Sequence, residues 1–198
     1  LRLGHTFDGD EDSNLARDSF VQCLILSQEA GSEAFEAAAL AALSLMDLRE
    51  GRYERATEQL KASLSLQDKN HDLYAMADSK LLLALAWIGM GDPDRARTLL
   101  QEVLDTNRVN YHVRANFSTV LAHFCAATGR LSEAAQVLGF LDRTVLVGRR
   151  LNVLQTEALN LLVPRLRDEL GRDFETSFGL GQIMRPLDLH QFAAEILS

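Results

Sequence analysis

The stretch GRYERATEQL, at residues 51–60, decides the fold because it recurs in two altered copies. The copies are GDPDRARTLL at residues 91–100 and GRLSEAAQVL at residues 129–138. Tyrosine, proline or leucine follows two residues after each glycine, alanine five residues after it, and leucine nine residues after it. Because these positions are three and four residues apart, they fall on one face of an α-helix. The repeated positions are Tyr53, Pro93 and Leu131; Ala56, Ala96 and Ala134; Leu60, Leu100 and Leu138.

Each predicted helix begins just after a glycine, a residue that commonly ends the preceding helix. Asp92 and Pro93 add an N-cap acceptor and a proline suited to the first helical position. The segments before the glycines are apolar over most of their circumference, whereas those after them have a single apolar stripe. This contrast predicts hairpins of a buried inner helix and a half-exposed outer helix. The inner segments are AFEAAALAALSLMDL, KLLLALAWIGM and NFSTVLAHFCAAT.

Composition agrees with an all-α protein and excludes several classes of partner. The 198 residues are 47% hydrophobic, with only three prolines, which suits one large helical core. A net charge of -8 repels a phosphate backbone, so we expect no direct contact with nucleic acid. The longest apolar run, residues 81–90, is shorter than the about 20 residues that cross a bilayer, so we expect no membrane contact. No signal peptide is recognised, which predicts a cytoplasmic protein.

The domain organisation follows from the leader and the repeats. Residues 1–13 are acidic with little to bury, and we expect a flexible leader there. Residues 14–198 are predicted to form one helical-repeat domain. The repeat glycines are 40 and 38 residues apart, a spacing typical of helical hairpins that stack as a solenoid.

The repeated positions, with Leu43, Leu83 and Leu121 of the preceding segments, resemble a tetratricopeptide repeat (TPR). This resemblance implies an all-α, right-handed superhelix of antiparallel helical hairpins, a TPR-like α-solenoid. In such a superhelix one side of each inner helix lines a concave surface, and we expect a partner, a second copy or the chain's own C-terminal segment to cover it. The candidate concave interaction surface consists of Ala41, Leu45, Leu48, Leu81, Leu85, Ile88, Asn116, Thr119 and His123.

Longer stretches resemble the C-terminal helical-repeat region of large bacterial multidomain ATPase regulators of the LuxR type and their relatives. The resemblance covers about residues 14 to 197. It implies a non-catalytic region that senses a signal or partner and controls an ATPase domain, with ATP bound only in that preceding domain. It also implies that the chain is a C-terminal fragment. The stretches are ARDSFVQCLILSQEAG, EGRYERATEQLKASLSL, EAAQVLGFLDR and LRDELGRDFETSFGLGQIMRPLDLHQFAAEIL, the last including Phe174, Phe178 and Gly181.

Metal and cofactor chemistry finds little support in the sequence. Asp8, Asp10 and Asp12 match the first ligands of a calcium loop, but Ser13 and Ser19 replace its glycine and glutamate. We interpret this run as a leader to a helix that Asp12 or Ser13 caps. No phosphate-binding loop motif is present, and the histidines have no ligand spacing. We therefore expect no metal and no cofactor in this chain.

Four single residues allow two interpretations each. Cys23 and Cys125 lack metal-ligand spacing, so we expect reduced, buried thiols rather than a disulfide or a metal site. We expect Trp87 to fill a gap between hairpins rather than anchor a ligand. Pro164 is expected to bend or break the helical stretch at residues 151–170.

Three functions from different classes remain open. The first is an interaction and signal-sensing region of a larger ATP-dependent transcriptional or signalling regulator. The second is a free-standing TPR-like adaptor that binds a peptide or a partner protein. The third is an enzyme whose site no motif reveals, although no catalytic residue is predicted. Expected partners are another protein, the regulator's own N-terminal ATPase domain, or further copies in a homo-oligomer.

Overall fold

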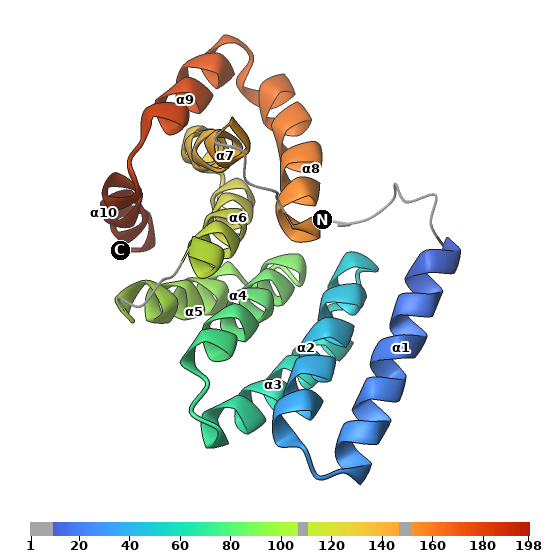
Figure 1. The fold of residues 1–198 in the computed structure, drawn as a ribbon. Coiled ribbons are helices and arrows are strands. Elements are labelled where there is room, and N and C mark those ends of the chain that lie inside the picture. Colours follow the sequence, from blue (N-terminus) through green and yellow to red (C-terminus); the bar gives the residue numbers. More distant parts are fainter. Residues whose placement is uncertain (1–9, 107–110, 147–151) are drawn as a thin grey trace. The chain divides into compact units, whose positions relative to one another are not determined.

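The computed structural model describes residues 10–106, 111–146 and 152–198, and within these ranges it contains ten α-helices and no β-strand (Figure 1). The predicted all-α class is therefore confirmed for the described residues. The helices are α1 (Asp10–Glu29), α2 (Glu33–Arg49), α3 (Tyr53–Lys69), α4 (Leu73–Gly89), α5 (Pro93–Asp105), α6 (Tyr111–Ala127), α7 (Leu131–Leu146), α8 (Val153–Leu170), α9 (Arg172–Ile183) and α10 (Pro186–Leu197).

The chain divides into two compact units, an N-terminal unit of residues 1–92 and a C-terminal unit of residues 93–198. The first contains α1 to α4 and the second contains α5 to α10. The single domain expected over residues 14–198 stays a prediction. At the start of the chain, residues 1–9 lie outside the described residues, and residues 10–13 of the expected leader belong to α1. The predicted cap at Asp12 or Ser13 is wrong, because α1 begins at Asp10, before both residues. The acidic residues at the start of α1 suit the first turn of a helix, where negative charge is favoured.

Glycine turns end five of the described helices, and three of these glycines, Gly51, Gly91 and Gly129, are those that begin the repeats. Gly31, Gly51, Gly91, Gly129 and Gly171 all have positive φ angles, between 56° and 80°. At the α2–α3 turn, the Gly51 N–H donates to the Leu48 carbonyl at 3.1 Å, and the Arg52 N–H donates to the Asp47 carbonyl at 2.8 Å. These bonds use carbonyls left free at the helix end, and a side chain at Gly51 would oppose the backbone conformation that allows them.

The turn between α3 and α4 was not predicted, because a histidine occupies the glycine position. His71 has a φ of 53°, and the Asp72 N–H donates to the Gln67 carbonyl at 3.0 Å, as in the glycine turns. The Asp72 side chain then caps α4 by accepting from the Ala75 N–H at 3.1 Å. Together with Gly31, Gly51 and Gly91, this turn gives the N-terminal unit one positive-φ residue every 20 residues.

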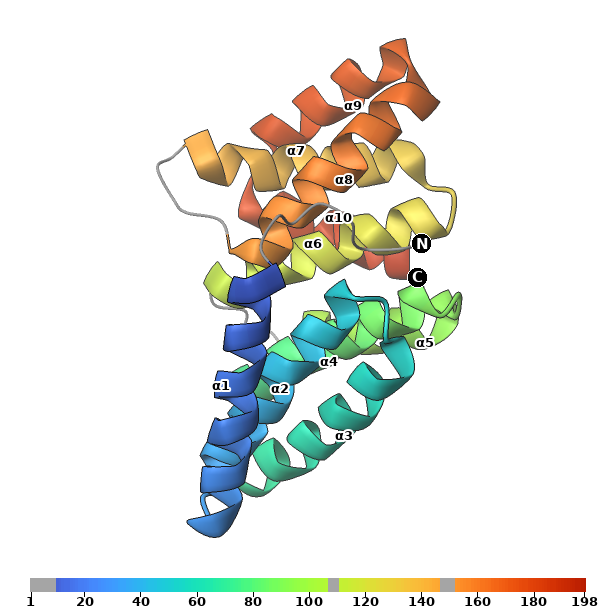
Figure 2. The ribbon, with the colours of Figure 1, turned by 90° about the vertical axis from the view of Figure 1, so that its right-hand side faces the viewer.

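The repeated alanines and leucines point inward, as expected from their helical spacing. Ala56, Ala96 and Ala134 are 0% exposed, and so are the three repeat leucines. The outer helix α5 buries a single stripe of residues, whereas the inner helix α4 buries four consecutive residues, 83–86. Within the two units, α2 packs against α3 and α6 packs against α7 (Figure 2). The predicted contrast holds for α4 and α5, but it is wrong for α7, an expected outer helix that buries the five consecutive residues 137–141. Three helices, α6, α8 and α9, pack against α7, so it does not have one exposed side like α5.

Replacing Ala96 with phenylalanine is expected to lower the free energy of unfolding by about 1 to 3 kcal/mol, because a ring must be forced into a fully buried site. Urea denaturation followed by circular dichroism measures this change. Thr98→Phe at an exposed position of the same helix is the control, expected within about 0.5 kcal/mol of the parent. Equal stability of the two variants would show that the repeat alanines are not packing positions.

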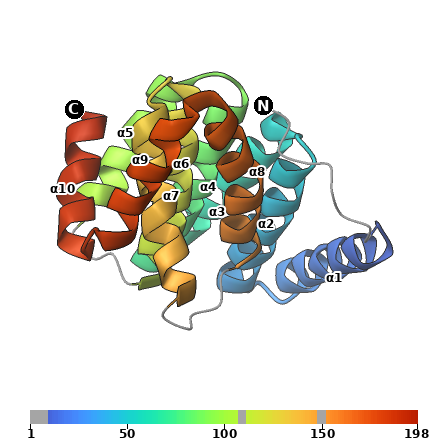
Figure 3. The ribbon, with the colours of Figure 1, turned by 90° about the horizontal axis from the view of Figure 1, so that it is seen from above.

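In the C-terminal unit, α7 packs against α6, α8 and α9, and α10 packs against α5. The backbones of α7 and α9 approach each other closely, and their ribbons lie side by side in Figures 2 and 3. A Cβ atom built on Gly181 would lie 1.8 Å from the Gln136 carbonyl oxygen, and one built on Gly139 would lie 2.0 Å from the Phe178 carbonyl oxygen. Two glycines therefore permit this helix crossing. Next to it, the rings of Phe174 and Phe178 stack with their centroids 5.3 Å apart.

The helix break expected at Pro164 is wrong, since α8 continues through the proline from Val153 to Leu170. The carbonyl that would accept a hydrogen bond from residue 164 belongs to Asn160, which is exposed. Water can hydrate that carbonyl, so the missing N–H costs less than it would in a buried helix. A capping box also fixes the start of α8, where the Asn152 side chain and the Gln155 side chain each bond the other residue's N–H.

Candidate interaction surface

Helix α1 is the least buried helix of the N-terminal unit. It packs against α2, and among residues 13–29 only Ser27 is buried. Its apolar side chains remain in part accessible: Leu15 is 64% exposed, Leu26 60% and Ile25 42%. Exposed leucines on one helix can form part of a surface that a partner covers.

A groove follows this open side of α1 and the beginning of α2. Its volume is about 670 Å³. The α1 residues that line it recur every three or four positions, so they share one helix face. Phe35, in the first turn of α2, is 66% exposed and forms the opposite wall. We call this surface the α1 groove; its lining residues are Leu15, Asp18, Ser19, Gln22, Cys23, Leu26, Ser27, Ala30, Ser32 and Phe35.

The charge around the α1 groove is acidic. Asp18 is the one charged residue in its lining. Nearby, Glu33 pairs with Lys69 at 3.1 Å, and Glu36 accepts a hydrogen bond from the Gln28 amide at 2.9 Å. Asp18 and Glu29 are exposed, and neither forms an ion pair within the described part of the chain. The groove therefore offers an apolar surface flanked by two accessible carboxylates.

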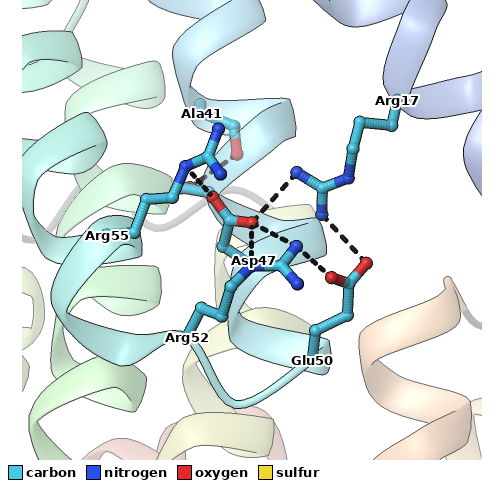
Figure 4. Close-up of polar contacts among 7 residues, drawn as sticks. Arg17, Ala41, Asp47, Glu50, Arg52 and Arg55 are labelled. Carbon is cyan, nitrogen blue, oxygen red and sulfur yellow. Dashed lines mark hydrogen bonds and ion pairs between the residues drawn. The ribbon is translucent and has the colours of Figure 1, made fainter.

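An ion cluster joins α1 to α2 and α3 and keeps the only basic residue of α1 away from the groove (Figure 4). The Arg17 guanidinium lies 3.0 Å from the Asp47 carboxylate and 2.9 Å from the Glu50 carboxylate. Asp47 has no exposed side-chain surface and also pairs with Arg52 at 2.7 Å and with Arg55 at 3.3 Å. Arg52 contacts Glu50 as well. The cluster fixes the N-terminal half of α1 at the C-terminal end of α2.

Asp47→Asn is expected to lower the free energy of unfolding by about 1 to 2 kcal/mol, because it removes the charge that three guanidinium groups share. The cost stays moderate since Arg17, Arg52 and Arg55 all retain some contact with solvent. Chemical denaturation measures it. The matched control is Asp94→Asn at an 88% exposed carboxylate, expected to change stability by less than about 0.5 kcal/mol. Similar effects of both substitutions would mean that the cluster does not stabilise the unit.

The residues predicted to line a concave surface are mostly buried. Six are in the N-terminal unit and three in the C-terminal unit. Ala41, Leu45 and Asn116 are partly exposed, and Asn116 accepts hydrogen bonds from the side chains of Asn152 and Gln155. These positions therefore do not present an open apolar strip that a partner could cover. The buried six are Leu48, Leu81, Leu85, Ile88, Thr119 and His123.

Two side chains considered for chemistry are enclosed in the C-terminal unit. Burial, and then the charge of Arg165, lowers the pKa of His123 to about 4, so this imidazole is neutral near pH 7. Its Nδ1 atom is buried without a hydrogen-bond partner. Burial raises the pKa of the Cys125 thiol to about 12, which keeps it protonated and unreactive.

The expectation for Cys23 is wrong, and the gap-filling role expected for Trp87 stays a prediction. Cys23 was expected to be buried but is partly exposed in the wall of the α1 groove, because that side of α1 has no neighbouring helix within its unit. Both cysteines are free thiols. Trp87 is partly exposed, and the Lys61 ammonium group lies 5.6 Å from its ring centroid. This contact joins α3 to α4.

The described ranges, residues 10–106, 111–146 and 152–198, contain neither a cluster of metal ligands nor a membrane-spanning helix. In those ranges no three His, Cys, Asp or Glu side chains are grouped so that they could hold a metal ion. Likewise, none of the helices found there combines the length and apolar character needed to cross a bilayer. The calcium-like run depends on Asp8, which lies outside the described residues.

The α1 groove was not predicted from the sequence. Its apolar residues have the spacing of an ordinary core helix, and only the packing of α1 shows which face stays open. No protein-family model, curated protein or solved structure matches the chain. The resemblance to LuxR-type ATPase regulators therefore stays a prediction.

Proposed function

We propose that the chain is a non-catalytic protein–protein interaction and signal-sensing region of a larger, cytoplasmic, ATP-dependent regulator. The observation that carries this proposal is the α1 groove, where Leu15, Leu26 and Phe35 are each at least 60% exposed. Large apolar side chains exposed together along one groove are typical of a surface that a partner covers.

The regular turns support the proposed architecture, a right-handed TPR-like superhelix. Helices α2, α3 and α4 each contain 17 residues, and positive-φ residues separate them at a constant interval. Equal helices joined by equal turns are what stacked repeats require. Such stacks commonly present extended surfaces to other proteins, which agrees with an interaction function.

The lining of the α1 groove supports binding rather than catalysis. It combines leucines and a phenylalanine with serines, an alanine, a glutamine, Asp18 and Cys23. Small residues between large ones leave recesses that a partner's side chains can fill. ATP, in this proposal, belongs to another domain of the regulator.

The test measures ATP hydrolysis by the full-length gene product. Leu26→Glu is expected to change the hydrolysis rate several-fold, because it places a charge in the α1 groove and disturbs the contact that controls the ATPase. The control is Leu187→Glu, at a leucine 75% exposed in the other unit, which should leave the rate unchanged. Equal rates in both variants would contradict control through this groove. A gene product without ATPase activity would contradict the regulator and favour the free-standing adaptor.

A further inference from the structure

We propose that the α1 groove binds a basic amphipathic helix of a partner protein. The inference rests on the interaction function proposed above and names the chemical class of the partner. The partner helix would present apolar side chains three and four residues apart to Leu15, Leu26 and Phe35. Its lysines or arginines would lie along the accessible carboxylates of α1.

The dimensions of the groove suit a helix. From Leu15 to Leu26 the groove face extends over 11 residues, or about 16 Å along α1. That length corresponds to about three turns of a partner helix, enough for three or four apolar contacts. Between the large side chains, Ser19, Ala30 and Ser32 leave room for the partner's side chains to enter.

The acidic residues around the α1 groove favour a basic partner. Between residues 13 and 36 the chain has four acidic residues and one basic residue, and the basic one, Arg17, points to Asp47 and Glu50. Asp18 and Glu29 are exposed, and each lies three residues from one end of the groove face, Asp18 from Leu15 and Glu29 from Leu26. They can therefore meet cations placed near either end of a bound helix. Opposite charges across a groove favour encounter and disfavour like-charged competitors.

The same charges argue against two other occupants. A second copy of the chain would bring its own acidic α1 against Asp18 and Glu29, and each copy has a net charge of -8. Like charges brought together in this way oppose association. An anionic lipid surface would be repelled for the same reason. A basic helix has neither disadvantage.

The test uses three labelled synthetic peptides of about 18 residues, or about five helical turns. The first has leucines along one helix face and lysines elsewhere, the second has glutamates in place of the lysines, and the third is a scrambled form of the first without an apolar face. Fluorescence anisotropy measures their binding to the chain. We expect the leucine–lysine peptide to bind at least about tenfold more tightly than the other two, and to weaken as salt is added.

Variants of the groove locate the site. Leu26→Ser and Phe35→Ser are expected to weaken binding about tenfold or more, because both remove large accessible apolar side chains. Asp18→Asn should weaken binding of the leucine–lysine peptide and reduce its salt dependence. Matched controls are Leu187→Ser and Glu58→Gln, which alter an exposed leucine and an exposed carboxylate outside the groove. Circular dichroism checks that each variant is folded.

Several results would overturn the proposal. Equal binding of the scrambled peptide would show attraction by net charge alone, and unchanged affinity in the groove variants would place the site elsewhere. Tighter binding of the leucine–glutamate peptide would mean that the partner helix is acidic rather than basic. A dimer in sedimentation that Phe35→Ser dissociates would make the groove an interface between copies. The ATP-hydrolysis test uses no peptide. A change in hydrolysis rate caused by Leu26→Glu would therefore still support the proposed interaction function if the leucine–lysine peptide does not bind.

Discussion

Gly181→Ala is expected to lower the free energy of unfolding by about 3 kcal/mol or more, a large effect for a single added methyl group. The added Cβ would lie 1.8 Å from the Gln136 carbonyl oxygen and 2.9 Å from the Phe140 backbone nitrogen. Both contacts are with the backbone of α7, which cannot move aside as a flexible side chain can. Helices α7 and α9 must therefore separate, and the core around Phe174, which is 0% exposed, must repack.

The same helix provides the control for this prediction. Gly179 also lies in α9, but a Cβ atom built on it has no neighbouring atom within 4 Å. Gly179→Ala should stabilise the protein by a few tenths of a kcal/mol up to about 1 kcal/mol, because alanine is the better helix former. Thermal or urea denaturation followed by circular dichroism compares the two variants. If Gly181→Ala is as stable as Gly179→Ala, the helices do not cross as closely as the structure shows.

The turns and the repeat cores were predictable because local chemistry determines them. Gly51 needs a backbone conformation that other residues rarely adopt, and Ala56 and Leu60 follow it at helical spacing. The turn between α3 and α4 was missed because a residue other than glycine occupies it. His71 adopts the same turn without being a glycine, and only the flanking Asn70 and Asp72 could have indicated it.

Properties that depend on neighbouring helices were not predictable. Gly181 was noted in the C-terminal stretch, but nothing local reveals that its Cβ position is occupied by another helix's backbone. Pro164 was expected to break α8, and the outcome depends on whether the Asn160 carbonyl is exposed. Leu15 and Leu26 have the spacing of core residues, yet their helix has no neighbour on that side within its unit. The α1 groove is therefore a result of tertiary packing that no sequence motif marks.

Stability is expected to fall as the pH is lowered from about 6.5 to about 4, and His123 should account for a loss of up to about 3 kcal/mol. In the folded state burial, and then the charge of Arg165, lowers the pKa of His123 from 6.5 to about 4. In the unfolded state the imidazole is in water and binds a proton near pH 6.5. Between these two values the unfolded state binds more protons, so acid favours unfolding.

The direction follows from the two protonation equilibria. Above pH 6.5 neither state is protonated at His123, and the full stabilisation is present. Below pH 4 both states are protonated at His123, so this residue no longer makes the free energy of unfolding depend on pH. The difference between 6.5 and about 4 corresponds to about 3 kcal/mol, since each pKa unit is worth about 1.4 kcal/mol.

The measurement compares urea denaturation at pH 7 and pH 4.5 for the parent, His123→Gln and His190→Gln. Carboxylates titrate over the same range, but they do so in all three proteins, so the difference between proteins isolates the histidine. His123→Gln should lose less stability on acidification than the parent, because its amide does not bind a proton. His190 is exposed, and its variant should retain the parent's full pH dependence. If His123→Gln loses as much stability as the parent, the imidazole is already protonated or hydrated in the folded state, and the C-terminal unit does not enclose it as described.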